Sequence, residues 1–275
     1  MIVKTNGGLS VISAFVDGIG SAISLDLPMY TTVIESDSDK IGDQKILETL
    51  EIIRNKYSIN KKYSVEIKSQ IPQSVGLKSS SAMTLSLLYA ILRLNRIYLK
   101  EDELLRSAAE ISLKNKTSIT GALDDISMCY YGGLTVTDNF DFRLIRRIKI
   151  ENTPVIIAYP KFYHRSTYDM KDIDFKKYKK YIQKLELLLN SKYVYETMVL
   201  NGYLFGSLFG YDPEIINYFL GSGAIFSGIS GKGPAVFAIY EDNEDRDNAA
   251  SKFSYQNYNI IKSRINNDGI NIIYQ

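Results

Sequence analysis

The sequence has few of the residues that build disulfides and transition-metal sites. It contains one cysteine, Cys129, and one histidine, His164, among its 275 residues, and no tryptophan. A single thiol excludes an internal disulfide and a cysteine-rich zinc site, and a single imidazole excludes a histidine-rich metal centre. Any metal that this chain binds must therefore use oxygen ligands.

The chain also lacks an excess of charge and any long apolar run. Its 33 lysine and arginine residues nearly balance 31 aspartate and glutamate residues, so the net charge is only +2. This balance gives no general reason to bind nucleic acid or an anionic membrane, and the basic run at 176–180 is interpreted as a solvated helix face. No apolar run approaches the ~20 residues of a membrane span, and residues 1–17 make a poor signal peptide. We therefore expect a cytoplasmic protein, monomeric or homodimeric, with neither a membrane nor a nucleic-acid partner.

What the chain does have is an ordinary globular composition with clear periodicity. With 45% hydrophobic residues, it can bury the core of one large domain or of two intimately packed ones. The apolar patterns predict an α+β fold. Predicted strands lie near 2–16, 21–35, 63–71, 133–138, 143–150, 154–159, 224–229, 234–240, 257–263 and 269–274. Predicted helices lie near 43–57, 79–94, 101–114, 174–190, 192–209, 212–220 and 243–254.

The most informative stretch runs from Pro72 to Ala82 and joins a predicted strand to a predicted helix through a glycine and three serines. The proline ends the strand, and Ser79 or Ser80 suits the N-cap of the helix. Unpaired backbone N–H groups at a helix start favour an anion, as do the Lys78 ammonium and the close backbone approach that a glycine allows. The stretch is therefore a candidate polyphosphate cradle.

This stretch is not a Walker A loop, because its lysine follows a leucine, and Gly231-Lys232-Gly233 fails because Phe226 stands where the first glycine is needed. It resembles instead the central motif of the GHMP kinases, Pro-x-x-x-Gly-Leu-x-Ser-Ser-(Ala/Ser), in which every fixed position is matched. The resemblance implies that ATP binds here. The residues implied in nucleotide binding are Pro72, Val75, Gly76, Leu77, Lys78, Ser79, Ser80, Ser81 and Ala82.

Asp124 and Asp125 stand together in an otherwise apolar stretch that leads to a Gly-Gly pair. Buried unpaired carboxylates cost several kcal/mol, and a capping role would explain one aspartate better than two. Six residues separate Asp125 from Gly132, and the resemblance implies that spacing for the aspartate beside the acceptor hydroxyl. Asp125 is therefore assigned to the hydroxyl, with Asp124 supporting it or the metal, and the reverse assignment stays open.

A third segment, Gly228 to Ala238, contains a glycine-rich turn followed by a predicted strand. Glycines permit backbone conformations that are closed to other residues and bring N–H groups close to a ligand. Alone, the segment is typical of a hairpin turn. Its place after the other two segments follows the order of the GHMP motifs, and the resemblance implies that Gly231 and Gly233 contact substrate.

Within the GHMP kinases the chain most resembles the archaeal-type shikimate kinases. It has Lys78 where most members have a small residue, Gly18-Ile19-Gly20-Ser21-Ala22 early in the chain, and the double aspartate. It lacks the Gly-Glu-His pattern of mevalonate kinase and galactokinase. The resemblance implies an S5-domain-2-like N-terminal domain, residues 1–150, that binds ATP, and a ferredoxin-like C-terminal domain, residues 151–275.

The resemblance also implies the chemistry, which is Mg²⁺-dependent transfer of the γ-phosphate of ATP to the 3-hydroxyl of shikimate. Ser80 and Glu110 would hold Mg²⁺, and the loop would hold the β- and γ-phosphates. Gly20 and Ser21 are candidate shikimate contacts. Arg165 is a candidate because the shikimate carboxylate needs a cation.

Other functions stay open from the sequence. A GHMP kinase for another small alcohol, such as homoserine, pantoate or a mevalonate derivative, would keep the same motifs. A GHMP-fold sensor would bind nucleotide or metabolite without transfer, but Asp125, Ser80 and the glycine turn argue against it. An RNA-binding protein on the S5-like fold would need a basic stripe with interleaved aromatic residues, which the sequence lacks.

Overall fold

The computed structural model describes residues 1–162 and 173–274. The strands are β1 (Ile2–Ile12), β2 (Ile19–Ser36), β3 (Lys62–Ser69), β4 (Leu134–Asp138), β5 (Arg143–Ile148), β6 (Pro154–Pro160), β7 (Phe226–Ile229), β8 (Val236–Ile239), β9 (Tyr258–Arg264) and β10 (Asn271–Tyr274). The helices are α1 (Gln44–Tyr57), α2 (Ser79–Leu94), α3 (Glu101–Lys114), α4 (Leu123–Tyr131), the 3₁₀ helix η2 (Phe175–Tyr178), α5 (Lys179–Asn190), α6 (Val194–Phe209), α7 (Glu214–Gly221) and α8 (Asn243–Lys252). The α+β prediction is confirmed.

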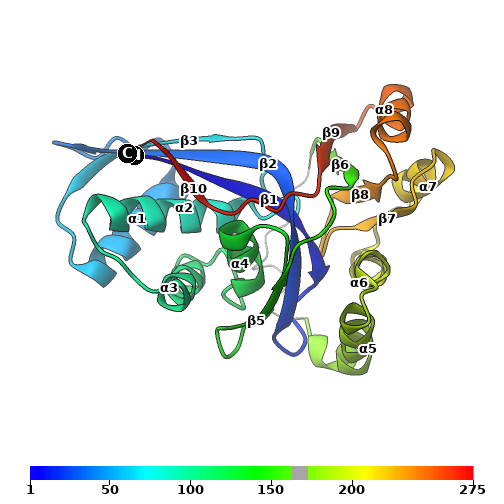
Figure 1. Ribbon diagram of the computed structural model, residues 1–275, viewed down its shortest axis with the longest axis horizontal. Coiled ribbons are helices and arrows are strands. Elements are labelled where there is room, and N and C mark those ends of the chain that lie inside the picture. The colour runs from blue at the N-terminus through cyan, green and yellow to red at the C-terminus, as the bar shows by residue number, and fades with distance from the viewer. Residues whose placement is uncertain (163–172, 275) are drawn as a thin grey trace.

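The first sheet has the order β10-β1-β2-β4-β5, with β3 beside β2 (Figure 1). Strand β2 is long enough to pair with β4 near its start, where Ile19 lies opposite Asp138, and with β3 near its end, where Met29 lies opposite Ser69. Strand β10 returns to pair with β1, so both termini lie at the same end of this sheet. The expected domain boundary at residue 150 therefore does not separate the two sheets completely, because β10, from the second part of the chain, belongs to the first sheet.

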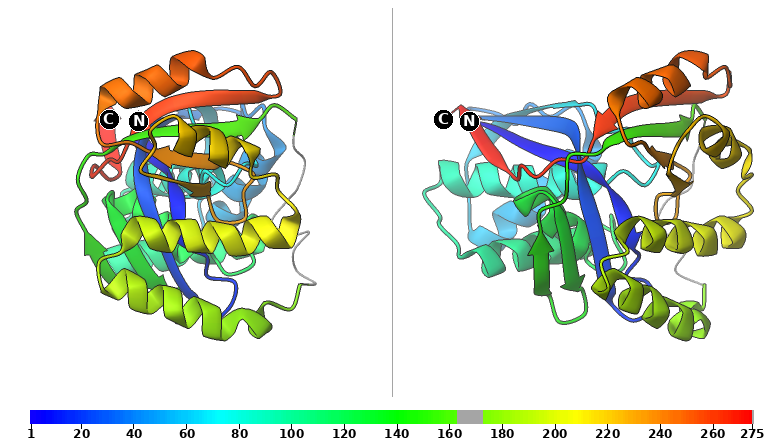
Figure 2. Two further views of the ribbon diagram at one scale, coloured as in Figure 1. Left: turned by 90° about the vertical axis from the view of Figure 1, so that its right-hand side faces the viewer. Right: turned by 45° about the vertical axis from the view of Figure 1, so that its right-hand side comes forward.

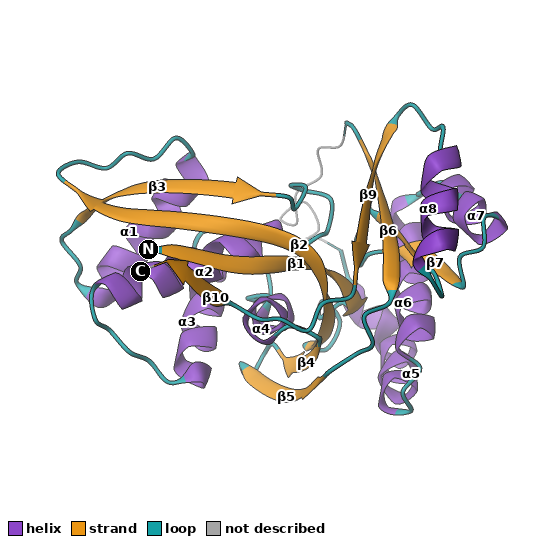
Figure 3. Ribbon diagram, turned by 45° about the horizontal axis from the view of Figure 1, so that its top comes forward, coloured by secondary structure: helices purple, strands orange, loops and turns teal. Residues whose placement is uncertain are grey.

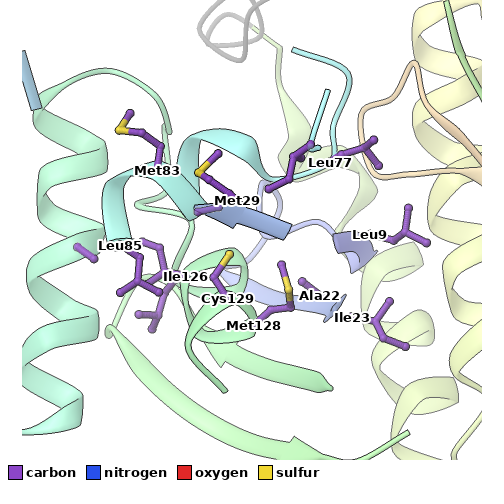
Figure 4. Close-up of a cluster of buried hydrophobic side chains, with 14 of the residues drawn as sticks. Leu9, Ala22, Ile23, Met29, Leu77, Met83, Leu85, Ile126, Met128 and Cys129 are labelled. Carbon is purple, nitrogen blue, oxygen red and sulfur yellow. The ribbon is translucent and has the colours of Figure 1, made fainter. Parts of the chain in front are cut away.

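Helices α2 and α4 pack against one face of the first sheet, and α1 and α3 pack against these helices on the same side (Figures 1 and 3). Figure 4 shows part of the core between them, where side chains of β1 and β2 meet those of α2 and α4. The following residues of this cluster are each at most 8% exposed: Leu9, Ala22, Ile23, Met29, Met83, Leu85, Ile126, Met128 and Cys129. Truncating one such leucine to alanine typically costs about 2–5 kcal/mol. The starts of α2 and α4 therefore rest on a rigid base.

The second sheet has the order β7-β8-β6-β9 and is covered on both faces (Figure 2). Alternation along β6 explains this: Val155 and Ile157 join the large core with α6, while Ile156 and Ala158 join a smaller core with α7 and α8. Helix α6 contacts both β7 and β1. It therefore links the two halves of the molecule.

The connection between β1 and β2 docks on the second half of the chain. The ring of Phe15 stacks on Phe175 at 5.4 Å and meets Phe205 edge-on at 5.9 Å. The backbone N–H of Ser13 donates to the Asn201 Oδ1 at 3.0 Å. These contacts hold the connection against α6, at the boundary between the halves.

Two segments differ from expectation. The predicted helix at 174–190 is divided into η2 and α5, because Asp174 caps a separate short turn by accepting from the Lys176 N–H. The stretch from Leu123 to Tyr131, which is not among the predicted helices, is helix α4, so both adjacent aspartates lie in its first turn. Within the described residues, no helix combines the length and apolar character that a membrane crossing requires.

Candidate active site

A cleft with a cavity volume of about 120 Å³ lies where the predicted motifs meet. Its walls come from four segments: the β1–β2 connection, the 72–81 stretch, residues 117–125 leading into α4, and the turn at 230–232. The structure thus brings together segments that are far apart in the sequence. Among the described residues, no three histidine, cysteine, aspartate or glutamate side chains gather as a metal site.

Helix α2 begins at Ser79, and its N-cap is Lys78 in the left-handed conformation, with φ 71°. The expectation that Ser79 or Ser80 forms the N-cap is therefore wrong, because both are already helical. Lys78 makes no side-chain cap, since its ammonium is directed to other partners. The first N–H groups of the helix are left without that cap, and such groups bind anions well. Ser79, Ser80 and Ser81 line the cleft beside them.

Gly76 joins this loop to the turn of the second half. Its φ is +89°, and a Cβ there would lie 3.1 Å from the carbonyl oxygens of Ser230 and Gly233. The Ser230 hydroxyl donates to the Gly76 carbonyl at 3.2 Å, and the Ala235 N–H donates to the Val75 carbonyl at 3.1 Å. Glycine is thus needed at position 76 for its conformation and for the close approach of the second half.

The Lys78 ammonium lies 2.8 Å from Asp125 Oδ1 and also donates to the Ser10 hydroxyl. The two side chains of the ion pair are only 10% and 16% exposed. Burial acts to lower the pKa of Lys78, but the carboxylates of Asp125 and Asp124 outweigh it and hold this pKa above its ordinary value. The lysine is therefore a fixed positive charge at the entrance to α2.

Asp124 also lines the cleft and interacts electrostatically with both members of this ion pair. Its Oδ1 accepts from the Asn139 Nδ2 at 2.8 Å, and its side chain is almost fully buried. Burial, followed by the charge of Asp125, raises the pKa of Asp124 to about 7, against opposing effects of Lys78 and Asn139. The cluster therefore holds two carboxylates and one cation.

Several predicted site residues lie elsewhere. A Cβ at Gly20 would be 2.8 Å from Asp124 Oδ2, so this glycine makes room for the aspartate and does not line the cleft. Ser21 is buried and its hydroxyl donates to the Thr135 carbonyl at 2.8 Å. Glu110 lies on α3, paired with Lys56 at 2.6 Å, and is absent from the cleft lining. The structure therefore does not support Gly20 and Ser21 as substrate contacts or Glu110 as a metal ligand.

Some of the other predicted site residues line the cleft and others do not. Gly231 and Gly233 have φ of +57° and +68° and shape the turn, but Ser230 and Lys232 are its members that line the cleft. Of the loop residues, Val75 and Ala82 belong to the core and the others line the cleft. Arg165 lies outside the described residues.

Sequence reasoning missed the polar residues that complete the cleft. They include Ser10 and Ser13 of the first segment and Thr117 and Thr120 before α4. Asn139, which is not a lining residue, was missed too; it follows β4 and donates to Asp124. Small polar residues occur in most surface loops, so no local signal distinguished these from others.

Comparisons with known proteins agree with this geometry. Residues 44–133 match the model of the GHMP kinases N terminal domain, and residues 186–259 match the GHMP kinases C terminal model. The shikimate kinase of Thermoplasma acidophilum is 37% identical over 268 residues, which is 98% of this chain and 96% of that protein. The shikimate kinase of Pyrococcus furiosus is 34% identical, over 88% of this chain and 92% of that protein.

Solved structures extend the likeness in fold. The mevalonate kinase of Methanococcus jannaschii superposes with a TM-score of 0.76 at 18% identity, covering 96% of this chain and 98% of that one. A homoserine kinase from Cytophaga hutchinsonii superposes with a TM-score of 0.69 at 18% identity, covering 99% and 97%. The chain therefore belongs to the GHMP kinases, and within them it is related over its whole length to the archaeal shikimate kinases, as its motifs indicated.

Proposed function

We propose that the protein transfers the γ-phosphate of ATP to the 3-hydroxyl of shikimate, giving shikimate 3-phosphate and ADP. The observation that carries the proposal is the Lys78–Asp125 ion pair, which lies at the start of α2 inside the cleft. A fixed cation and a carboxylate at a helix N-terminus suit phosphoryl transfer to an alcohol. The acceptor is named from the relatives, because the two shikimate kinases match nearly the whole chain.

ATP is proposed to bind with its β- and γ-phosphates at the start of α2, against the hydroxyls of Ser79, Ser80 and Ser81. A second hollow of about 540 Å³ adjoins the cleft and shares Ser74, Ser79, Ser80 and Thr117 with it. Its other walls are partly apolar and include Met29, Ile46, Ile67 and Met83. This hollow suits the nucleoside of ATP, because an apolar slot beside the phosphate site would hold a base without competing for the phosphates.

The donor chemistry of the cleft fits Mg²⁺, which prefers oxygen and is commonly held by a few protein ligands together with nucleotide phosphates and water. Ser80 is the residue proposed to hold it. Glu110 is not retained in this role because its carboxylate is engaged by Lys56. When bound, Mg²⁺ supplies charge neutralisation on the phosphates.

The acceptor hydroxyl is proposed to lie against Asp125, which orients it toward the γ-phosphorus. As the oxygen–phosphorus bond forms, the bond from the γ-phosphorus to the β–γ bridging oxygen breaks and ADP leaves. The transition state is loose, so the hydroxyl proton passes late to Asp125, and positioning matters more than a strong base. Lys78 neutralises charge and keeps the Asp125 carboxylate in place.

Shikimate carries a carboxylate and three hydroxyls, so its pocket needs a cation and several directional partners. Among the described lining residues, Ser13 and Thr120 offer hydroxyls in the same cleft as Asp125. Lys232 lines the cleft from the second half. It is a second candidate for the carboxylate beside Arg165.

The proposal is tested by ADP release from the purified protein with Mg²⁺ and ATP across shikimate, homoserine, pantoate and mevalonate. We expect turnover with shikimate, and product analysis should place the phosphate on the 3-hydroxyl. Turnover of homoserine or mevalonate with none of shikimate would overturn the choice of acceptor and keep the kinase. Nucleotide binding without ADP release from any acceptor would indicate a sensor.

A further inference from the structure

Asn139 is a buried residue, 1% exposed, that follows β4 and uses all of its amide groups. Its Nδ2 donates to Asp124 Oδ1 at 2.8 Å and, at a longer 3.4 Å, to the Thr120 hydroxyl. Its Oδ1 accepts from the Thr137 hydroxyl at 2.7 Å, and its backbone N–H donates to the Gly18 carbonyl at 2.8 Å. A side-chain amide offers two donor hydrogens and one acceptor oxygen, so none is idle here.

These partners fix the direction of the amide. Because the ionised Asp124 carboxylate can only accept, the NH₂ group of Asn139 faces it, and Oδ1 is left to accept from the Thr137 hydroxyl. The reversed amide would place an oxygen against a carboxylate oxygen, which is repulsive. Asn139 is therefore a preset hydrogen-bond donor aimed at one oxygen of Asp124.

The groups around Asp124 make that donor important. The charged groups that face it are Asp125 on the same helix and Lys78 from the loop before α2. From β2 it meets Gly20, whose missing side chain leaves room for the second carboxylate oxygen. Two carboxylates thus share one cation, and a donor to a carboxylate favours its charged form. Asn139 thus favours the ionised form of Asp124 through a hydrogen bond and adds no charge of its own.

We propose that Asn139 is a positioning residue for phosphoryl transfer, which orients Asp124 and holds it ionised beside Asp125. An ionised Asp124 leaves the cluster with Lys78 one negative charge in excess and increases the affinity of Asp125 for the acceptor proton. Asn139 thus acts through Asp124 and touches no reacting atom. The inference rests on the proposed kinase function.

The test compares Asn139→Ala and Asn139→Asp with the parent over pH 5.5–9.5, measuring kcat and KM for ATP and for shikimate. We expect kcat at pH 7 to fall roughly 10-fold while KM for ATP changes little. The acid limb of the kcat profile should move up by about one pH unit, and activity should recover at high pH. Asn139→Asp should move the limb further, because a third carboxylate then faces Asp124 in the same volume.

The matched control is Asn95→Ala, which removes two hydrogen bonds of 2.7 Å, to the Tyr63 hydroxyl and the Ile91 carbonyl, away from the cleft. It should lower the melting temperature and leave the acid limb in place. The proposal would be overturned if the Asn139 variants are folded and the acid limb of their kcat profile lies at the same pH as in the parent. So would a kcat loss that is equal at every pH, because that is the result of a purely structural role.

A direct titration separates this inference from the choice of acceptor. The ¹³C carboxyl signals of Asp124 and Asp125 can be followed with pH in the parent and in Asn139→Ala, without any acceptor present. We expect the coupled titration to move to higher pH in the variant. An unchanged titration would overturn the inference even if shikimate is phosphorylated, and a shifted titration would uphold the contact even if the acceptor is another alcohol.

Discussion

Two regions of the molecule bury cations among carboxylates, and they do so in opposite ways. Between α1 and β3, Arg54 donates to both carboxylate oxygens of Asp39 and to Glu51, and it is only 6% exposed. Asp39 also accepts from the Tyr63 N–H at 3.0 Å. These bonds, first of all those from Arg54, hold the pKa of Asp39 well below its usual range. Lys62 of β3 adds a second cation, with its ammonium 3.2 Å from Asp39 Oδ2, so two cations serve two carboxylates here and fasten α1 to the sheet.

In the cleft, a single lysine serves two carboxylates. Lys78 pairs with Asp125, while Asp124 depends on a neutral amide and its pKa is raised to about 7. A buried charge without its own counter-ion costs stability, and such groups are retained mainly where they do chemistry. The contrast teaches that the number of cations per carboxylate, more than burial alone, separates a structural pair from a reactive one.

The strongest way to break the comparison is Asp125→Asn. This change keeps the size of the side chain but removes its charge and proton acceptor, so kcat should fall by 100-fold or more, about 2.7 kcal/mol of transition-state stabilisation. ATP affinity should change little, and affinity for shikimate should be measured beside the rate because part of the loss reflects orientation. Asp124→Asn should be milder. A nearly active Asp125→Asn together with a dead Asp124→Asn would reverse the two assignments.

The structural cluster is tested by Arg54→Met, which leaves Asp39 partly buried without its main partner. We expect the free energy of unfolding at pH 7 to fall by about 2–3 kcal/mol, with kcat unchanged. The folded pKa of Asp39 is depressed, so its contribution is present above the unfolded pKa of about 4 and is lost as the pH falls below it. Urea unfolding should therefore show that the parent exceeds the variant in free energy of unfolding by more at pH 7 than at pH 3. A loss of turnover in the folded variant would contradict a purely structural role.

Gly76→Val tests whether the cleft cluster depends on contact between the halves. The valine would need a φ of +89° and would press on the carbonyls of Ser230 and Gly233. ATP binding should weaken roughly 10-fold, about 1.4 kcal/mol, as calorimetric titration would show. Gly221→Val is the matched control, because a Cβ at Gly221 meets nothing within 4 Å. Equal ATP affinities in the two variants would sink this account of the loop.

Asp124→Asn should show the smallest effect of the four. We expect it to raise thermal stability at alkaline pH. The folded pKa of Asp124 is raised, so the protonated group stabilises the fold below the unfolded pKa of about 4, and this stability is lost as the pH rises to about 7. The variant escapes that loss, and its melting temperature at pH 8 should exceed that of the parent by roughly 2–4 °C per kcal/mol gained. At pH 4 the two should melt together. A lower melting temperature for the variant at pH 8 would show that the ionised aspartate is stabilising.

Local features of the chain were predicted well, while pairings of distant residues were not. Helix α3 spans the predicted 101–114, and the loop at 72–82 joins a strand to a helix as expected. Neither the Lys78–Asp125 ion pair nor the Asn139–Asp124 contact was predicted, because each joins residues that only the packed fold brings together. Glu110 shows the same limit: its helix was predicted correctly, but its ion pair with Lys56 was not.

By itself, the sequence determined what depends on neighbours along the chain. Alternation in Tyr63, Val65 and Ile67 specifies a half-buried strand, and the glycine and serines that follow specify a turn into a helix with anion-binding character. Only the tertiary structure decided which residues share the cleft. Strand register turned Ser21 toward Thr135 and set Gly20 under Asp124, and docking of the second half placed Ser230 on the loop. The physical reason is that side-chain partners across a sheet or between domains depend on register and packing, which no local pattern encodes.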